Sequence, residues 1–144
     1  MKILFVCTGN TCRSPMAEGI FNARAAERGS SATASSCGVA AFNQPACEYA
    51  VRAAAEHGAD IGGHVSRKAS EAIIKDADAV FAMTRSICEM LRTAYPEQRE
   101  KIYTFSGKDV SDPYGGSMEE YSRTAGEIEA GVDVILLNIG EKDR

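Results

Sequence analysis

Short apolar runs alternate with helix-like segments along this chain of 144 residues, and the alternation restricts the folds open to it. Strands are predicted at residues 2–7, 33–37, 78–83 and 101–105, and helices at 15–28, 46–57, 69–76, 85–94 and 117–138. Strands that alternate with helices favour a parallel sheet whose two faces are both covered by helices. The predicted fold is therefore a single doubly wound α/β domain, residues 1–144, built around a four-stranded parallel sheet.

Charge and hydropathy narrow the classes of function. Lys and Arg number 16 against 20 Asp and Glu, which leaves a net charge of −4 and predicts no basic face for nucleic acid. No apolar stretch approaches the roughly 20 residues that a membrane-spanning helix needs, so no membrane partner is expected. The five cysteines are an odd number without a leader sequence before them. This favours reduced thiols in the cytoplasm over a disulfide framework.

The turn between the first predicted strand and the first predicted helix, residues 7–14, concentrates the chemistry. A loop in this position can aim successive backbone N–H groups inward, and the helix N-terminus adds its positive dipole end. Such a cradle suits a tetrahedral oxyanion, and its field favours the thiolate form of Cys7, a nucleophile at neutral pH. Arg13 stands at the far lip, where its planar fork can hold two oxygens of a phosphoryl group. The predicted phosphate-binding loop is completed by Thr8, Gly9, Asn10, Thr11, Cys12 and Ser14.

Three residues of this turn carry further expectations. Ser14 is predicted to serve twice, as the N-cap of the helix that Pro15 begins and as a hydroxyl donor to the Cys7 sulfur. Gly9 suits a backbone with positive φ. Asn10 suits side-chain hydrogen bonds that shape the loop.

Other interpretations of the turn fit its residues less well. A Walker-type nucleotide loop needs Lys before its Ser or Thr, whereas this turn has Arg there. A metal site needs closely paired ligands, but Cys7 and Cys12 are separated by four residues with no second pair, and the histidines, His57 and His64, are remote in sequence. No metal or organic cofactor is implied, because the thiolate, the backbone cradle and Arg13 supply the nucleophile and the charge stabilisation. The remaining alternative is a buried cysteine at a strand end beside a surface arginine.

The spacing of Cys7, five residues, then Arg13 and Ser14, resembles that of the low-molecular-weight protein tyrosine phosphatase family. The family also has an Asp-Pro pair in a loop near its C-terminus, here Asp112-Pro113, and its length and order of elements match essentially all 144 residues. The resemblance implies that Cys7 attacks phosphorus to form a cysteinyl-phosphate. It also implies that Asp112 protonates the leaving group and then activates water. Without the resemblance, Asp112 would be interpreted as a turn residue before proline.

Two positions bear on the substrate. Tyrosine-specific members of the family usually carry a bulky aliphatic residue at position 11 and two consecutive aromatics after Asp-Pro, whereas this chain has Thr11 and Tyr114-Gly115-Gly116. These features resemble the protein arginine phosphatase branch. Thr11 offers a polar contact to a guanidinium, and Tyr114 can stack on a planar group. The predicted partners are therefore phosphorylated protein substrates, with phosphoarginine favoured over phosphotyrosine.

Two further functions remain as alternatives. Arsenate reductases share the loop but need a pair of additional cysteines to relay a disulfide. Cys37, Cys47 and Cys88 lie in separate predicted elements, where packing is their expected role. A non-catalytic anion-binding module could dispense with Cys7 or Asp112, and both are present.

Cys12 is a candidate redox residue. In the family that the chain resembles, the second loop cysteine can form a reversible disulfide with the nucleophile. Peroxide is therefore expected to inactivate this protein reversibly through a Cys7–Cys12 bond. A phosphatase that works through a thiolate also needs a reducing compartment, which strengthens the cytoplasmic prediction. The sequence leaves the oligomeric state open.

Overall fold

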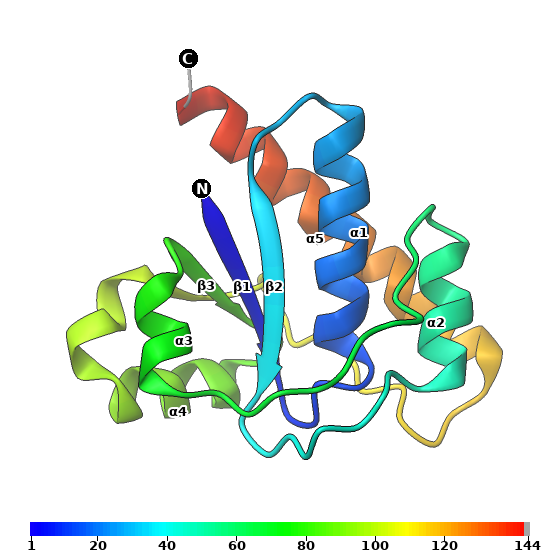
Figure 1. Ribbon diagram of the computed structural model, residues 1–144, viewed down its shortest axis with the longest axis horizontal. Coiled ribbons are helices and arrows are strands. Elements are labelled where there is room, and N and C mark those ends of the chain that lie inside the picture. The colour runs from blue at the N-terminus through cyan, green and yellow to red at the C-terminus, as the bar shows by residue number, and fades with distance from the viewer. Residues whose placement is uncertain (143–144) are drawn as a thin grey trace.

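The computed structural model describes residues 1–142 as a four-stranded parallel sheet with helices on both faces, which confirms the predicted fold class (Figure 1). The spatial order of the strands is β2-β1-β3-β4. The strands are β1 (Lys2–Cys7), β2 (Thr33–Gly38), β3 (Ala79–Ala82) and β4 (Ile102–Thr104). The helices are α1 (Arg13–Glu27), α2 (Glu48–Ala55), α3 (Glu71–Asp76), α4 (Arg85–Ala94) and α5 (Met118–Lys142), with a 3-10 helix, η1, at Pro96–Lys101.

Strand β1 is central and divides the interior into two halves. Its alternate side chains Ile3 and Phe5 belong to the core that α1, α2 and α5 cover. Leu4 and Val6 belong to the core beneath α3 and α4. Successive side chains of a strand point to opposite faces, so a continuous apolar run is what a strand between two helical layers requires. Figure 1 shows the two layers on either side of the sheet.

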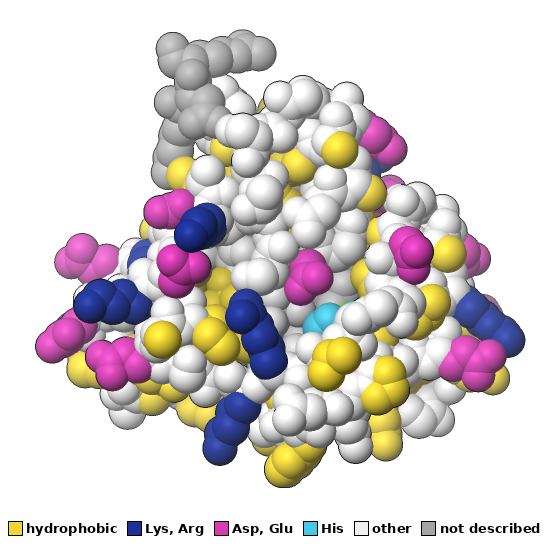
Figure 2. All heavy atoms as spheres, viewed as in Figure 1, with side chains coloured by type: hydrophobic (Ala, Val, Ile, Leu, Met, Phe, Trp, Pro, Cys, Tyr) yellow, Lys and Arg dark blue, Asp and Glu magenta, His cyan; other side chains and the backbone are white. Residues whose placement is uncertain are grey.

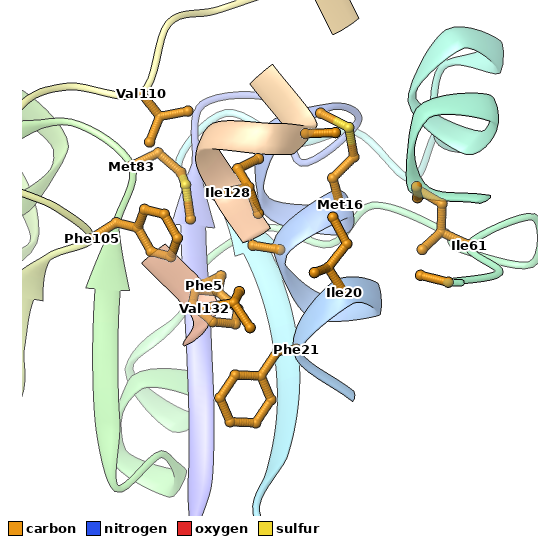
Figure 3. Close-up of a cluster of buried hydrophobic side chains, with 14 of the residues drawn as sticks. Phe5, Met16, Ile20, Phe21, Ile61, Met83, Phe105, Val110, Ile128 and Val132 are labelled. Carbon is orange, nitrogen blue, oxygen red and sulfur yellow. The ribbon is translucent and has the colours of Figure 1, made fainter. Parts of the chain in front are cut away.

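The larger core fixes the end of β1. The ring of Phe5 lies edge-on to Phe21 of α1 and to Phe105, with 5.8 Å between ring centroids in both pairs. Figure 3 shows Ile128 and Val132 of α5 beside the same cluster. Full burial of one such side chain stabilises the fold by about 1.5–3 kcal/mol. The strand that ends in Cys7 is therefore anchored by packing on both of its faces.

Helix α1 begins two residues earlier than predicted. Its first helical residue is Arg13, and Cys12 is the N-cap without a side-chain capping bond, so the prediction of Ser14 as N-cap is wrong. The Ser14 hydroxyl instead lies 2.9 Å from the Cys7 sulfur. Pro15 becomes the third helical residue, which is tolerated because the first four N–H groups of a helix have no partner within it.

The other differences concern element ends. Helix α2 is shorter than the predicted 46–57, and α5 runs to Lys142 rather than 138. A side chain at Gly131 of α5 would overlap the ring of Phe105, so this glycine allows the helix to pack closely. The 3-10 helix was not predicted. Within residues 1–142, no helix combines the length and the apolar content that crossing a membrane requires.

Candidate active site

The candidate active site lies at the carboxyl ends of the parallel strands, where ligands bind in doubly wound sheets. The loop after β1 borders a cavity of about 270 Å³. The predicted residues Cys7, Thr11, Arg13, Asp112 and Tyr114 all line it, as do Thr8, Gly9 and Cys12. Segments separated by about one hundred residues of sequence are therefore brought to one cavity.

The Cys7 sulfur sits among hydrogen-bonding groups at the base of this loop. Cys7 is 2% exposed. The backbone N–H of Asn10 donates to its sulfur at 3.2 Å, and the Ser14 hydroxyl lies at 2.9 Å. When Cys7 is ionised, only the hydroxyl can donate in the latter pair. These donors and the nearby N-terminus of α1 stabilise a thiolate, which is the nucleophilic form of cysteine.

The left-handed residue of the loop is Asn10, with φ of 56°, and not Gly9 as predicted. Asn10 is fully buried. Its side-chain amide donates to the Ser14 hydroxyl at 2.7 Å and to the Ser36 hydroxyl at 3.0 Å. Its side-chain oxygen accepts from the backbone N–H of Arg67 at 3.0 Å. Asn is among the few residues that adopt this conformation, and here its hydrogen bonds hold the loop in it.

Two more residues outside the loop shape it. His64 Nε2 lies 2.8 Å from the backbone oxygen of Asn10. A Cβ on Gly38, at the end of β2, would lie 2.6 Å from the carbonyl oxygen of Thr8 and 2.9 Å from the nitrogen of Asn10. Only glycine therefore lets β2 approach the loop so closely.

We expect Asn10→Ala to lower the free energy of unfolding by about 3–4 kcal/mol. The variant loses three side-chain hydrogen bonds, each worth about 1 kcal/mol, and places alanine in the left-handed region. Asn10→Gly is expected to cost about 1 kcal/mol less, because glycine tolerates the backbone. Urea unfolding measures both. Asn43→Ala is the matched control, since Asn43 also has a positive φ, of 51°, but is exposed. Equal losses in Asn10→Ala and Asn43→Ala would contradict a stabilising role for the network.

Arg13 is buried and fixed in place. Its guanidinium donates to the backbone oxygen of Val110 at 3.1 Å, which orients the group. A second nitrogen of the guanidinium lies 3.6 Å from Oδ2 of Asp112. Buried arginine with a planar fork can hold two oxygens of a phosphoryl group. Arg13 therefore stands between the loop and the candidate acid.

Asp112 has features of both of its sequence interpretations. Its Oδ1 accepts a hydrogen bond from the backbone N–H of Tyr114 at 3.1 Å, as in a turn residue. Its carboxylate also faces Arg13, and the residue lines the cavity. Its side chain is 55% exposed, so water reaches the carboxylate.

The loop after β2 supplies lining residues that sequence reasoning missed. Ala40, Phe42 and Gln44 border the cavity, and Phe42 is 78% exposed. Tyr114, at 73% exposed, is the second aromatic on the cavity. Figure 2 shows hydrophobic side chains at the lower edge of the molecule, where the loops after the strands lie in Figure 1. The position of this loop could have predicted that Ala40, Phe42 and Gln44 line the cavity, because the carboxyl ends of parallel strands meet at one edge of the sheet.

All five cysteines are free thiols. Burial raises the pKa of Cys37 to about 12 and also raises the pKa of Cys88, and both side chains pack in the core beneath α3 and α4. Cys12 differs from these: its sulfur lies 3.1 Å from the sulfur of Cys47 and 3.4 Å from the hydroxyl oxygen of Tyr121. Burial raises the pKa of Cys12 to about 12. Among residues 1–142, no three His, Cys, Asp or Glu side chains gather in a way that could hold a metal ion.

Comparison with known proteins identifies the family. The sequence matches the family described as low molecular weight phosphotyrosine protein phosphatase over residues 2–144. A protein-arginine-phosphatase of Bacillus subtilis (strain 168) is 40% identical over 136 residues, which is 90% of each chain. A solved low molecular weight protein tyrosine phosphatase from T. tengcongensis is 43% identical, with a TM-score of 0.92, and the match covers 96% of this chain and 99% of that one.

A third relative carries a phosphoryl group at its active site. It is a YwlE arginine phosphatase in which serine replaces the active-site cysteine and is phosphorylated. It is 37% identical, with a TM-score of 0.93, and the match covers 100% of this chain and 98% of that one. The resemblance inferred from the loop is thereby confirmed. This chain belongs to the low molecular weight phosphotyrosine protein phosphatase family.

Proposed function

We propose that this phosphoprotein phosphatase hydrolyses phosphoarginine in proteins and works through a cysteinyl-phosphate formed on Cys7. The observation that carries the proposal is one cavity bordered by a hydrogen-bonded cysteine sulfur, a buried arginine and a partly exposed carboxyl group. Nucleophile, anion clamp and acid are the three groups that phosphoryl transfer through a covalent intermediate requires.

Each group has a step in the mechanism. The Cys7 thiolate attacks phosphorus, while the loop N–H groups and Arg13 hold the other phosphoryl oxygens and stabilise their charge in the transition state. Asp112 donates a proton to the leaving nitrogen as the P–N bond breaks. In the second step Asp112, now a carboxylate, takes a proton from water, which attacks the cysteinyl-phosphate and releases phosphate with the Cys7 thiolate.

The mouth of the cavity supports phosphoarginine as the substrate. Thr11 places a hydroxyl on the wall, which can accept a hydrogen bond from a guanidinium N–H. Phe42 and Tyr114 supply aromatic surface on which a planar guanidinium can stack. The relative in Bacillus subtilis is named a protein-arginine-phosphatase. Phosphotyrosine is the second candidate, favoured by the same aromatic surface and by the tyrosine phosphatase from T. tengcongensis.

Thr11→Ile tests the choice between the two substrates. We expect the substitution to lower kcat/KM for a phosphoarginine peptide and to shift the ratio of phosphoarginine to phosphotyrosine turnover by about tenfold, because an apolar wall leaves guanidinium donors unpaired. Steady-state turnover of matched peptides measures the ratio. Thr11→Ser is the control, since it keeps the hydroxyl and is expected to keep the preference. A wild type that prefers phosphotyrosine would overturn the substrate proposal.

We also propose a reversible response to oxidation and a location in the cell, because both depend on Cys7 as the nucleophile. A reactive Cys7 thiolate is open to oxidation by peroxide, and Cys12 in the same loop supports a reversible Cys7–Cys12 disulfide as the inactive form. Such an enzyme needs a reducing environment, so we propose that it works in the cytoplasm. Inactivation by peroxide that dithiothreitol does not reverse would contradict the disulfide.

A further inference from the structure

We propose that Cys47 is a second resolving thiol. Its sulfur attacks the Cys12 sulfur of the Cys7–Cys12 disulfide, which forms a Cys12–Cys47 disulfide and releases Cys7 as a free thiol. The proposal rests on the role of Cys7 as the oxidised nucleophile. The final product of oxidation is then a disulfide between two neighbouring cysteines, Cys12 and Cys47, and the nucleophile Cys7 is restored.

The geometry of the pair carries the proposal. The two sulfurs, on Cys12 and Cys47, are 3.1 Å apart in the reduced protein. The backbone N–H of Cys47 donates to the carbonyl oxygen of Thr11 at 2.9 Å, so the two chain segments are already hydrogen-bonded side by side. A disulfide has about 2.05 Å between its sulfurs, so bond formation needs a movement of about 1 Å.

The surroundings of the three sulfurs give the exchange a direction. The Cys7 sulfur accepts from the Asn10 N–H and lies against the Ser14 hydroxyl, so the loop stabilises Cys7 as a departing thiolate. At Cys12 the effect of burial outweighs that of the nearby Tyr121 hydroxyl and raises the pKa to about 12. Cys47 is only half-buried, so its sulfur is accessible to solvent. In thiol–disulfide exchange the more stable thiolate leaves faster. Attack by Cys47 on the sulfur of Cys12 therefore expels Cys7.

The steps balance with an organic hydroperoxide as the oxidant. The Cys7 thiolate attacks the terminal oxygen, the O–O bond breaks, and Cys7 becomes a sulfenic acid while the hydroperoxide leaves as an alcohol after taking up a proton. The Cys12 sulfur then attacks the Cys7 sulfur, the S–O bond breaks, and water leaves with the Cys12 proton. Finally the Cys47 thiolate, its proton given to solvent, attacks the Cys12 sulfur and Cys7 leaves as a thiolate. Overall, one hydroperoxide and two thiols yield one disulfide, one alcohol and one water.

Peptide mapping separates the two disulfides. Trypsin leaves Cys7 and Cys12 together in the peptide 3–13 and Cys47 in the peptide 29–52. The protein is treated with tert-butyl hydroperoxide, desalted, alkylated and digested without reductant. We expect a cross-link between the two peptides, with alkylated Cys7, and fragmentation that places the bond on Cys47 rather than Cys37. A peptide 3–13 that is two hydrogens lighter and not cross-linked, as the final product, would overturn the relay.

Activity without added thiol gives the second measurement. After desalting, the wild type is expected to regain about tenfold more activity than Cys47→Ser before any dithiothreitol is added, because the variant stays at the Cys7–Cys12 bond. Dithiothreitol is expected to restore both. Cys47→Ala serves as a second variant, and Cys88→Ser, whose thiol is buried in the core away from the loop, is the matched control and should recover like the wild type. Recovery of Cys47→Ser at the wild-type level would overturn the relay.

A third experiment tests the pairing of Cys12 with Cys47 independently of the catalytic role of Cys7. Diamide oxidises neighbouring thiols directly, so Cys7→Ser treated with diamide is expected to give the cross-link between peptides 3–13 and 29–52. Absence of the cross-link there would overturn the pairing itself. A wild type whose Cys7 resists the hydroperoxide, although diamide links Cys12 to Cys47, would contradict the reactive role of Cys7 and overturn the relay.

Discussion

Replacing Cys7 by serine is expected to lower kcat on a phosphoarginine peptide by at least about four orders of magnitude. The thiol can exist as a thiolate beside the Asn10 N–H and the Ser14 hydroxyl, whereas a serine hydroxyl stays protonated at neutral pH and is a poor nucleophile. The loop N–H groups and Arg13 are unchanged, so phosphate and vanadate should still bind. Steady-state turnover and isothermal titration calorimetry with vanadate measure the two properties separately.

The control for this substitution is Cys88→Ser, which removes a thiol that lies in the core beneath α3 and α4. Its turnover should stay within about threefold of the wild type, because that thiol touches none of the reacting groups. Wild-type turnover in Cys7→Ser would exclude Cys7 as the nucleophile. A wild type that binds vanadate but hydrolyses neither peptide nor para-nitrophenyl phosphate would identify a binding module instead.

The sequence predicted those features that short segments determine. The apolar run of β1 and the loop from Cys7 to Ser14 are continuous in sequence, and each has a physical signature that one segment carries. Asp112 depended on resemblance, because an Asp before proline is also a common turn residue. The structure brings it to 3.6 Å from Arg13.

The features that were missed depend on contacts between distant segments. The positive φ of Asn10 is favoured by hydrogen bonds to Ser36 and to the backbone of Arg67, which no local pattern announces. Intrinsic preference alone favours Gly9 for this conformation, since glycine adopts positive φ most readily. Cys47 was expected to pack, and it contacts Cys12 because the loop after β2 returns to the carboxyl edge of the sheet. Tertiary contacts thus decide how the loop is supported and which thiols meet.

Asp112→Asn is expected to lower kcat on a phosphoarginine peptide by roughly 10²–10⁴-fold, the usual contribution of a positioned acid. The substitution keeps the size of the side chain but removes the proton donor. A guanidine is a very strong base, so it leaves phosphorus only when its nitrogen is protonated as the bond breaks. Nitrophenolate is a much weaker base and leaves without a strong need for a proton. The rate at which the cysteinyl-phosphate forms from para-nitrophenyl phosphate should therefore fall far less.

Formation and hydrolysis of the cysteinyl-phosphate can therefore be measured separately in Asp112→Asn. Because Asp112 also activates water in the second step, stopped-flow measurement of Asp112→Asn with para-nitrophenyl phosphate should show a burst of nitrophenolate followed by slow turnover, as the cysteinyl-phosphate accumulates. Asp109→Asn is the matched control: it lies in the same loop, but its carboxylate accepts from the backbone N–H of Arg85 at 2.8 Å and it does not line the cavity. Its kcat should stay within about threefold of the wild type. An equal loss on both substrates without a burst would argue against Asp112 as the acid, because removing a proton donor must cost the stronger base more.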